Sequence, residues 1–214
     1  MAARKRPPAT LVLLVRHGTT ATTGKVLPGR AAGLHLTESG RTQAEAVAAR
    51  LAELPNVAAL YVSPLERTRE TAVPIAATLG LKPVVERGLL ECDFGEWTGS
   101  ELKALGKLPE WGTVQRYPSG FRFPGGESFV EMQTRVVDAV SRLVARHRGE
   151  VVVAVSHADP IKAIAAHALG THLDLFQRIV ISPCSVTAIA YTDGGPHVLA
   201  VNDTGRSLRD LRPS

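Results

Sequence analysis

Apolar runs of strand length, each followed by a segment of helical periodicity, constrain the fold of this chain more than any other feature. The apolar runs cover residues 11–15, 57–62 and 151–155, with a short one at 83–85. Apolar positions recur at helical spacing over residues 37–54, 63–79 and 129–147, and another helix is expected from Asp159 and Pro160. This alternation predicts an α/β three-layer sandwich, with a mostly parallel central sheet and helices on both faces.

The end of the chain and one internal stretch depart from that rhythm. Residues 185–191 and 197–201, joined through Asp193-Gly194-Gly195, indicate a closing hairpin. Residues 100–127 are rich in proline and glycine, and we interpret them as a short lid insertion. Ser63 and Pro64 are expected to cap and open the second helix. We therefore expect one domain over residues 1–214, with tails at about 1–9 and 204–214.

Composition excludes several classes of protein. Apolar residues make up 44% of the chain and charged residues 21%, which is an ordinary globular balance. Two distant cysteines, Cys92 and Cys184, argue against a disulfide framework, and no apolar run is long enough for a signal peptide or membrane span. We expect a cytoplasmic protein without a membrane partner.

A net charge of +5 would suit an anionic partner. Much of the excess lies in the two tails, at Arg4, Lys5, Arg6, Arg206, Arg209 and Arg212. Because no aromatic residues interleave with these charges, we interpret them as solvated tails and expect no nucleic-acid partner.

Reactive or cationic residues follow three of the predicted strands. Arg16 and His17 come directly after the first, Arg67 follows the second in the first turn of a helix, and His157 follows the strand at 151–155. Each residue alone has an ordinary structural explanation. Together they fall on the carboxyl edge of one sheet, where α/β folds bind their ligands.

The sequence around these positions resembles the histidine phosphatase superfamily, the phosphoglycerate-mutase-like fold. The resemblance lies in blocks that occur in family order between about residues 11 and 160: Leu14-Val15-Arg16-His17-Gly18-Thr19-Thr20, Leu36-Thr37-Glu38-Ser39-Gly40, Ser63-Pro64-Leu65-Glu66-Arg67-Thr68, Leu90-Glu91, Phe94-Gly95-Glu96-Trp97, Gly125-Gly126-Glu127-Ser128 and Val155-Ser156-His157. The segment from Ser156 to Lys162 is also similar to an actinobacterial subgroup named as phosphomutases.

The resemblance implies a role for five residues. His17 would attack phosphorus and become phosphohistidine, while Arg16, Arg67 and His157 would hold the phosphoryl oxygens. Glu91 would give a proton to the leaving oxygen and later take one from water. Phosphoryl transfer needs positive charge around three equatorial oxygens, which guanidinium groups supply without a metal or cofactor.

These roles set conditions on protonation. His17 must present a neutral nitrogen, so its other ring nitrogen should donate to a backbone carbonyl. Glu91 must be protonated when the ester arrives, and burial would raise its pKa. His157 is expected to act as a cationic clamp at the N-terminus of a helix.

Further candidates for substrate binding are Thr20, Thr23 and Arg30, with Lys162 as a second cation. Thr19 stands where many relatives have glutamate, and Thr23 where many have asparagine. A threonine hydroxyl can still donate to a phosphoryl oxygen. Cys92, the remaining histidines and the two tryptophans Trp97 and Trp111 are interpreted as structural or surface residues.

Three functions fit these residues. The leading hypothesis is a phosphomonoester hydrolase acting on a small phosphorylated metabolite. A phosphoglycerate-mutase-type phosphomutase is the alternative, and it differs only in whether water reaches the phosphohistidine. The predicted lid has few basic residues (Lys103, Lys107, Arg116 and Arg122), which favours the hydrolase. A non-catalytic phosphoryl-binding protein is the third hypothesis, and a homodimer is left open.

Overall fold

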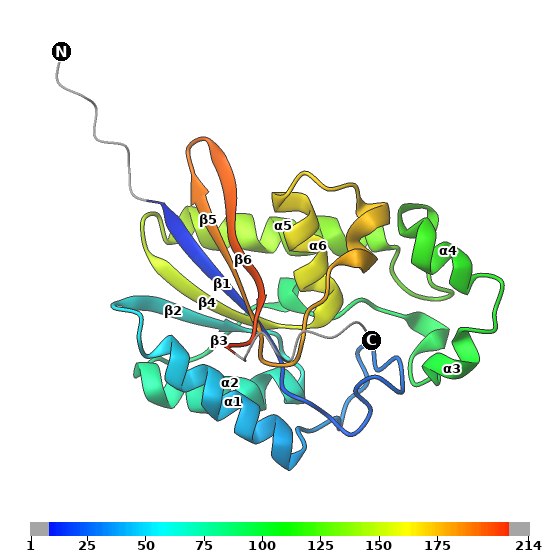
Figure 1. Cartoon of the computed structure of the whole chain (residues 1–214), viewed down its shortest axis with the longest axis horizontal. Coiled ribbons are helices and arrows are strands. Elements are labelled where there is room, and N and C mark those ends of the chain that lie inside the picture. The colour runs from blue at the N-terminus through cyan, green and yellow to red at the C-terminus, as the bar shows by residue number, and fades with distance from the viewer. Residues whose placement is uncertain (1–8, 206–214) are drawn as a thin grey trace.

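A computed structural model describes residues 9–205 of the chain. Within this range a six-stranded sheet has the order β3-β2-β4-β1-β5-β6 (Figure 1). The pairs β1–β4, β2–β4 and β2–β3 are parallel, whereas β5 pairs antiparallel with both β1 and β6. The strands are β1 (Thr10–Arg16), β2 (Val57–Val62), β3 (Val84–Val85), β4 (Val151–Ser156), β5 (Val186–Thr192) and β6 (Gly195–Asp203).

Helices cover both faces of the sheet. Figure 1 shows α1 and α2 on one side, α5 and α6 on the other, and α3 and α4 beyond one end of the strands. The α-helices are α1 (Glu38–Leu51), α2 (Glu66–Leu79), α3 (Leu102–Leu105), α4 (Trp111–Arg116), α5 (Phe129–Arg146) and α6 (Ala158–Ala168). Short 3-10 helices are η1 (Arg87–Leu89), η2 (Gly95–Trp97), η3 (Pro118–Gly120) and η4 (Leu173–Arg178). The predicted three-layer α/β architecture is confirmed.

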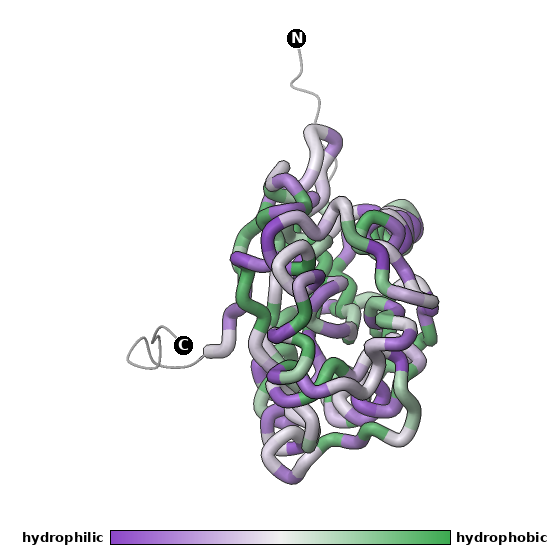
Figure 2. Tube along the Cα trace, turned by 90° about the vertical axis from the view of Figure 1, so that its right-hand side faces the viewer, coloured by the Kyte–Doolittle hydropathy of each residue, from purple (hydrophilic) through white to green (hydrophobic). Residues whose placement is uncertain are grey.

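Two apolar clusters lie on opposite faces of the sheet. Alternate residues of β1 point to opposite sides, so Leu13 and Val15 pack against α1 and α2, whereas Val12 and Leu14 pack toward α5 and α6. Hydrophobic and hydrophilic stretches alternate along the chain trace in Figure 2, as expected for helices that turn one face to the sheet. All four central residues of β4, Val152, Val153, Ala154 and Val155, are fully buried, which explains the unbroken apolar run.

Local signals explain where the helices begin. The Thr37 side chain accepts a hydrogen bond from the Gly40 amide at the start of α1, and Ser128 and Glu131 form a capping box at the start of α5. The second predicted helix is present as α2, but the expected roles of Ser63 and Pro64 as its cap and first residue were wrong, because α2 begins at Glu66 after Leu65. The Ser63 side chain instead faces a histidine across the sheet edge, as described below.

The predicted lid folds into α3, α4 and η3 and returns to the body through residues 121–128. No described helix is long and apolar enough to cross a membrane. The basic tail residues Arg4, Lys5, Arg6, Arg206, Arg209 and Arg212 lie outside the described residues. The division of the chain into one domain with two tails stays a prediction.

Candidate active site

The carboxyl ends of β1 and β4 bring the two predicted histidines together. These strands are parallel neighbours with Arg16 opposite Ser156, and the His17 amide donates to the Ser156 carbonyl over 3.0 Å. As a result, the rings of His17 and His157 meet edge to face, with centroids 5.3 Å apart. Both side chains are buried.

His17 has the hydrogen bond that a nucleophilic histidine requires. Its Nδ1 lies 2.8 Å from the Gly18 carbonyl, so Nδ1 carries the proton and the lone pair of Nε2 is available. Burial, and then the positive charges of Arg67 and Arg16, hold the pKa of His17 well below its ordinary value. The ring is therefore neutral even at mildly acidic pH. Gly18 is required here because a Cβ would lie 2.5 Å from the Gly40 carbonyl oxygen.

Two buried guanidinium groups flank the histidines. Arg16 donates from Nη1 to the Ile181 carbonyl over 2.6 Å, and Arg67 donates from Nη2 to the Gly29 carbonyl over 2.7 Å. Nε of Arg16, and Nε and Nη1 of Arg67, are buried without a hydrogen-bond partner among residues 9–205. Each buried, unpaired donor costs about 1–3 kcal/mol. Such donors fit an anion with several acceptor oxygens, for which guanidinium has the right charge and geometry.

His157 is held by Ser63, a residue whose part in the site the sequence did not indicate. Nε2 of His157 lies 2.8 Å from the Ser63 hydroxyl, and Nδ1 is buried without a partner in the described range. Burial and then the charge of Arg67 hold the pKa of His157 well below its ordinary value. In the absence of an anion, this shift disfavours the cationic form of His157, and the predicted clamp role stays a prediction. A phosphoryl dianion nearby would oppose this shift.

Glu91 is a buried acid that lines the same cleft as His17. Burial, and then the charge of Asp159, raise its pKa to about 7, while Arg67 acts in the opposite direction. Its Oε1 accepts a hydrogen bond from the Cys92 amide over 3.0 Å. At neutral or mildly acidic pH the carboxyl group can therefore hold the proton that a general acid must donate.

Thr20 and Thr23 lie side by side in the loop after His17. Their hydroxyl oxygens are 3.0 Å apart, and the Thr20 amide donates to the Thr23 hydroxyl. Thr19 instead uses its amide and hydroxyl on the Gln43 side chain. The loop therefore presents two hydroxyl groups, from Thr20 and Thr23, to the cleft that His17 lines.

That cleft has a volume of about 360 Å³ and has both polar and apolar lining residues. The polar ones include Arg16, His17, Thr20, Thr23 and Glu91, and the apolar ones include Leu27, Phe94, Leu102, Trp111, Val114, Phe123, Phe129 and Ile179. Leu102, Trp111, Val114 and Phe123 belong to the predicted lid, which does border the site. The basic lid residues Lys103, Lys107, Arg116 and Arg122 are exposed and do not line it.

Arg30, predicted as a substrate ligand, is engaged by other residues of the protein. Its Nε donates to the Glu91 carbonyl over 3.0 Å, and its guanidinium pairs with Glu127 and Asp93 at 2.8 and 3.4 Å. These partners draw the side chain behind Glu91, and Arg30 does not line the cleft. The sequence shows that Arg30 lies near a phosphate-binding motif, but it does not show which carboxylates pair with it.

Comparison with known proteins identifies the family. The sequence profile of the histidine phosphatase superfamily (branch 1) matches residues 12–204. The chain belongs to the histidine phosphatase superfamily. It is 35% identical over 204 residues to the bifunctional protein Rv2228c of Mycobacterium tuberculosis, an alignment that covers 92% of this chain and 54% of that protein. The chain thus spans about half the length of that relative.

Two other superfamily members are similar along most of their length. Phosphoserine phosphatase 1 of Hydrogenobacter thermophilus is 30% identical over 189 residues, which cover 82% of this chain and 85% of that protein. The structure of mycobacterial glucosyl-3-phosphoglycerate phosphatase superposes with a TM-score of 0.82 at 26% identity, covering 91% of this chain and 99% of that chain. The predicted family and fold are confirmed.

Other reactive groups of this superfamily member are accounted for by packing. Burial raises the pKa of the Cys92 thiol far above its ordinary value and that of Cys184 to about 12, so neither is a thiolate at neutral pH. The rings of Trp97 and Trp111 are stacked with centroids 6.3 Å apart, as expected for residues that pack the base of the lid. No group of three or more His, Cys, Asp or Glu side chains in residues 9–205 could hold a metal ion.

Asp159 and Lys162 are charged residues that also line the cleft. Lys162 donates to Asp159 and to Gln177 at 3.2 and 2.9 Å, and all three residues line the cleft. The sequence suggested Lys162 as an anion ligand, but not that Asp159 would affect Glu91. The position of Asp159 could have indicated that it lies near the site, because Asp159 is in the first turn of the helix that follows His157.

Replacing Asp159 with asparagine is expected to shift the alkaline limb of the activity profile to lower pH. The negative charge of Asp159 is the second-largest cause of the raised pKa of Glu91, so its removal lowers that pKa. The measurement is kcat/KM for phenyl phosphate between pH 5 and 9, with Asp138→Asn as an exposed control. An unchanged or alkaline-shifted limb would contradict the electrostatic coupling.

Proposed function

We propose that this chain is a phosphomonoester hydrolase that acts on a small phosphorylated metabolite through a phosphohistidine at His17. One observation carries the proposal. A neutral, buried histidine with an available Nε2 shares its surroundings with unpaired guanidinium donors and with a carboxyl group whose pKa is about 7. Nucleophile, anion site and acid are thus together at one sheet edge.

In the first step, Nε2 of His17 attacks phosphorus as the bond from phosphorus to the ester oxygen breaks. Glu91 transfers its proton to that oxygen, and the alcohol leaves. Donors of Arg16 and Arg67 and the ring of His157 hold the three equatorial oxygens, where charge is greatest.

In the second step, a water molecule attacks the phosphohistidine. Glu91, now a carboxylate, accepts a proton from the water, and the bond from phosphorus to Nε2 breaks. Inorganic phosphate leaves, His17 is neutral again and Glu91 is protonated again, so the cycle balances without a metal or redox partner.

Two features support a hydrolase over a mutase. Beyond the phosphoryl site the cleft lining is largely apolar, and the basic lid residues do not line it. Lys162 does line the cleft, but it is paired with Asp159, so little unpaired positive charge surrounds a second anionic group. Two of the three relatives described above are named as phosphatases. This lining suits a leaving group with an apolar part.

Turnover of p-nitrophenyl phosphate in excess EDTA tests the proposal. We expect activity at pH 5–7 that EDTA does not change, because guanidinium groups supply the positive charge. No turnover at any of these pH values would favour a non-catalytic phosphoryl-binding protein.

A second assay separates hydrolase from mutase. The protein is incubated with 3-phosphoglycerate, with and without 2,3-bisphosphoglycerate, and phosphorus NMR follows isomer and free phosphate. Isomerisation much faster than phosphate release would establish the mutase instead. A panel of phosphorylated metabolites then identifies the preferred leaving group.

A further inference from the structure

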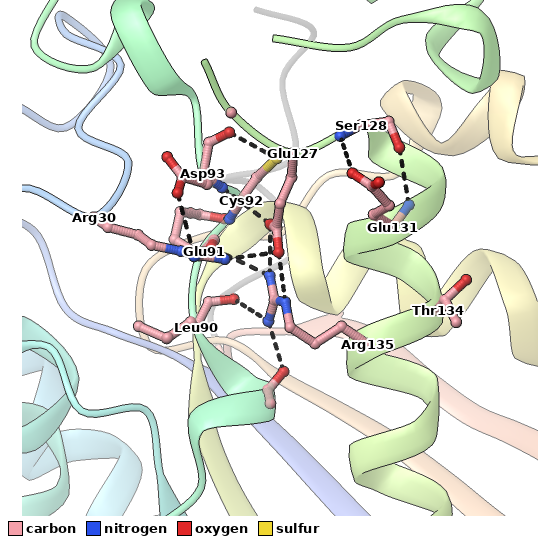
Figure 3. Close-up of polar contacts among 12 residues, drawn as sticks. Arg30, Leu90, Glu91, Cys92, Asp93, Glu127, Ser128, Glu131, Thr134 and Arg135 are labelled. Carbon is pink, nitrogen blue, oxygen red and sulfur yellow. Dashed lines mark hydrogen bonds and ion pairs between the residues drawn. The ribbon is translucent and has the colours of Figure 1, made fainter. Parts of the chain in front are cut away.

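We propose that Arg135 and Glu127 are positioning residues that fix the loop carrying Glu91. The proposal rests on the proposed function, in which Glu91 is the acid. Figure 3 shows the two side chains behind the loop, with Arg135 reaching from α5 and Glu127 from the end of the lid. Neither side chain lines the catalytic cleft.

The Arg135 side chain donates hydrogen bonds to this loop and to one carboxylate. Its Nη1 donates to the carbonyls of Gly88 and Leu90 at 2.8 and 3.0 Å, and its Nη2 approaches the Glu91 carbonyl at 3.3 Å. Nε and Nη2 also donate to the two oxygens of Glu127, each over 2.9 Å. A planar guanidinium with five N–H groups is the only side chain that can satisfy this set of acceptors.

Glu127 ties Arg135 to the other side of the same loop. Its Oε2 accepts from the Asp93 amide over 3.1 Å, and its backbone amide donates to the Asp93 carbonyl over 2.9 Å. Its Oε1 pairs with Arg30 over 2.8 Å, and Arg30 in turn donates to the Glu91 carbonyl (Figure 3). The Glu91 carbonyl is thus approached by two arginines that share one carboxylate.

A bond from the sheet fixes the loop on its opposite side. The Ser156 hydroxyl donates to the Leu89 carbonyl over 2.8 Å, next to His157. Residues 88–93 are therefore held between the catalytic edge of the sheet and α5. A general acid works only when its oxygen lies within hydrogen-bond reach of the leaving group, and small displacements are costly.

The charge arrangement suits this role. Unpaired arginines at this distance would stabilise the Glu91 carboxylate and lower its pKa. Glu127 neutralises much of their charge, and the pKa of Glu91 remains raised, with Arg67 and Arg16 rather than Arg30 or Arg135 as the cations that act against it. The two guanidinium groups can therefore hold the loop while the Glu91 carboxyl group keeps its proton.

Leaving-group dependence tests the proposal. In a mechanism that passes through phosphohistidine, kcat/KM reports only the steps up to departure of the leaving group. p-Nitrophenolate is a weak base that leaves with little help, whereas phenolate needs the proton of Glu91. A misplaced acid should therefore slow phenyl phosphate selectively. For Arg135→Gln, we expect kcat/KM for phenyl phosphate to fall at least about tenfold more than kcat/KM for p-nitrophenyl phosphate.

Three further variants make the result decisive. Glu127→Gln should show the same selectivity, and it keeps the shape of the side chain if Arg135→Gln does not fold. Arg146→Gln removes an exposed arginine three turns further along α5. This control should leave kcat/KM for both substrates unchanged. In a Glu91→Gln background, Arg135→Gln should no longer change the ratio of the two substrates, because no acid remains to be positioned.

Equal losses on both substrates in Arg135→Gln and Glu127→Gln would overturn the proposal and leave these residues a purely structural role. A selective loss that persists in the Glu91→Gln background would overturn it too. Absence of p-nitrophenyl phosphate turnover in the unmodified protein would instead refute the proposed function.

Discussion

Replacing His17 with alanine is expected to lower kcat/KM for p-nitrophenyl phosphate by at least about four orders of magnitude. The variant lacks the Nε2 that forms the covalent bond, and neither buried cysteine is a thiolate that could replace it. Water would have to attack the ester directly from a position that the protein does not organise. The measurement is the initial rate at pH 6, with urea unfolding to show that the variant is folded.

Trapping the covalent intermediate gives this prediction its control. Acid-labile, alkali-stable phosphate should form on the unmodified protein and on His167→Ala, which changes an exposed histidine of α6. It should be absent from His17→Ala. Retained turnover in His17→Ala, or covalent phosphate on that variant, would show that another group accepts phosphorus.

The sequence predicts the sheet edge well because its signals are local. Period and apolar runs locate β1, β2 and β4 within one or two residues, and parallel neighbours necessarily bring their carboxyl ends together. Arg16, His17 and His157 therefore meet once the order of the strands is known. The lid could be predicted as an insertion, but not which of its side chains face the cleft.

What the sequence could not reveal depends on partners that are distant along the chain. Arg30 is taken up by Glu127, 97 positions later by the residue numbers, and Ser63 contacts His157 across 94 positions. Protonation is equally non-local. Burial lowers the pKa of His157, although its place before a helix suggested a cation. The block Gly125-Gly126-Glu127-Ser128 could be recognised in the sequence as similar to the family. Only the contacts of Glu127 in the structure indicate its role.

Replacing Glu91 with glutamine is expected to lower kcat/KM for phenyl phosphate by about 10²–10⁴-fold at pH 6, because the amide cannot donate the acid's proton. In the unmodified protein kcat/KM should decline as pH rises through about 7, where the buried carboxyl group loses its proton. The variant should lose this alkaline limb. Rates from pH 5 to 9 measure both effects, and an unchanged limb in the variant would assign it to another group.

The same substitution should stabilise the fold at alkaline pH. Glu91 has a folded-state pKa of about 7 against an ordinary value of 4.5, so the folded state keeps a proton that the unfolded chain releases between these values. Relative to the Glu91→Gln variant, the unmodified protein therefore loses no stability below pH 4.5. Its free energy of unfolding falls by about 3 kcal/mol as the pH rises from 4.5 to about 7.

Urea unfolding of both proteins at several pH values tests this stability prediction. The advantage of Glu91→Gln should be near zero at pH 4 and should grow to its full value above pH 7. The glutamine oxygen can still accept from the Cys92 amide, so no hydrogen bond is removed with the charge. A difference that does not vary with pH would mean that Glu91 ionises in the folded state as readily as in the unfolded chain, and the role of acid would then pass to another group.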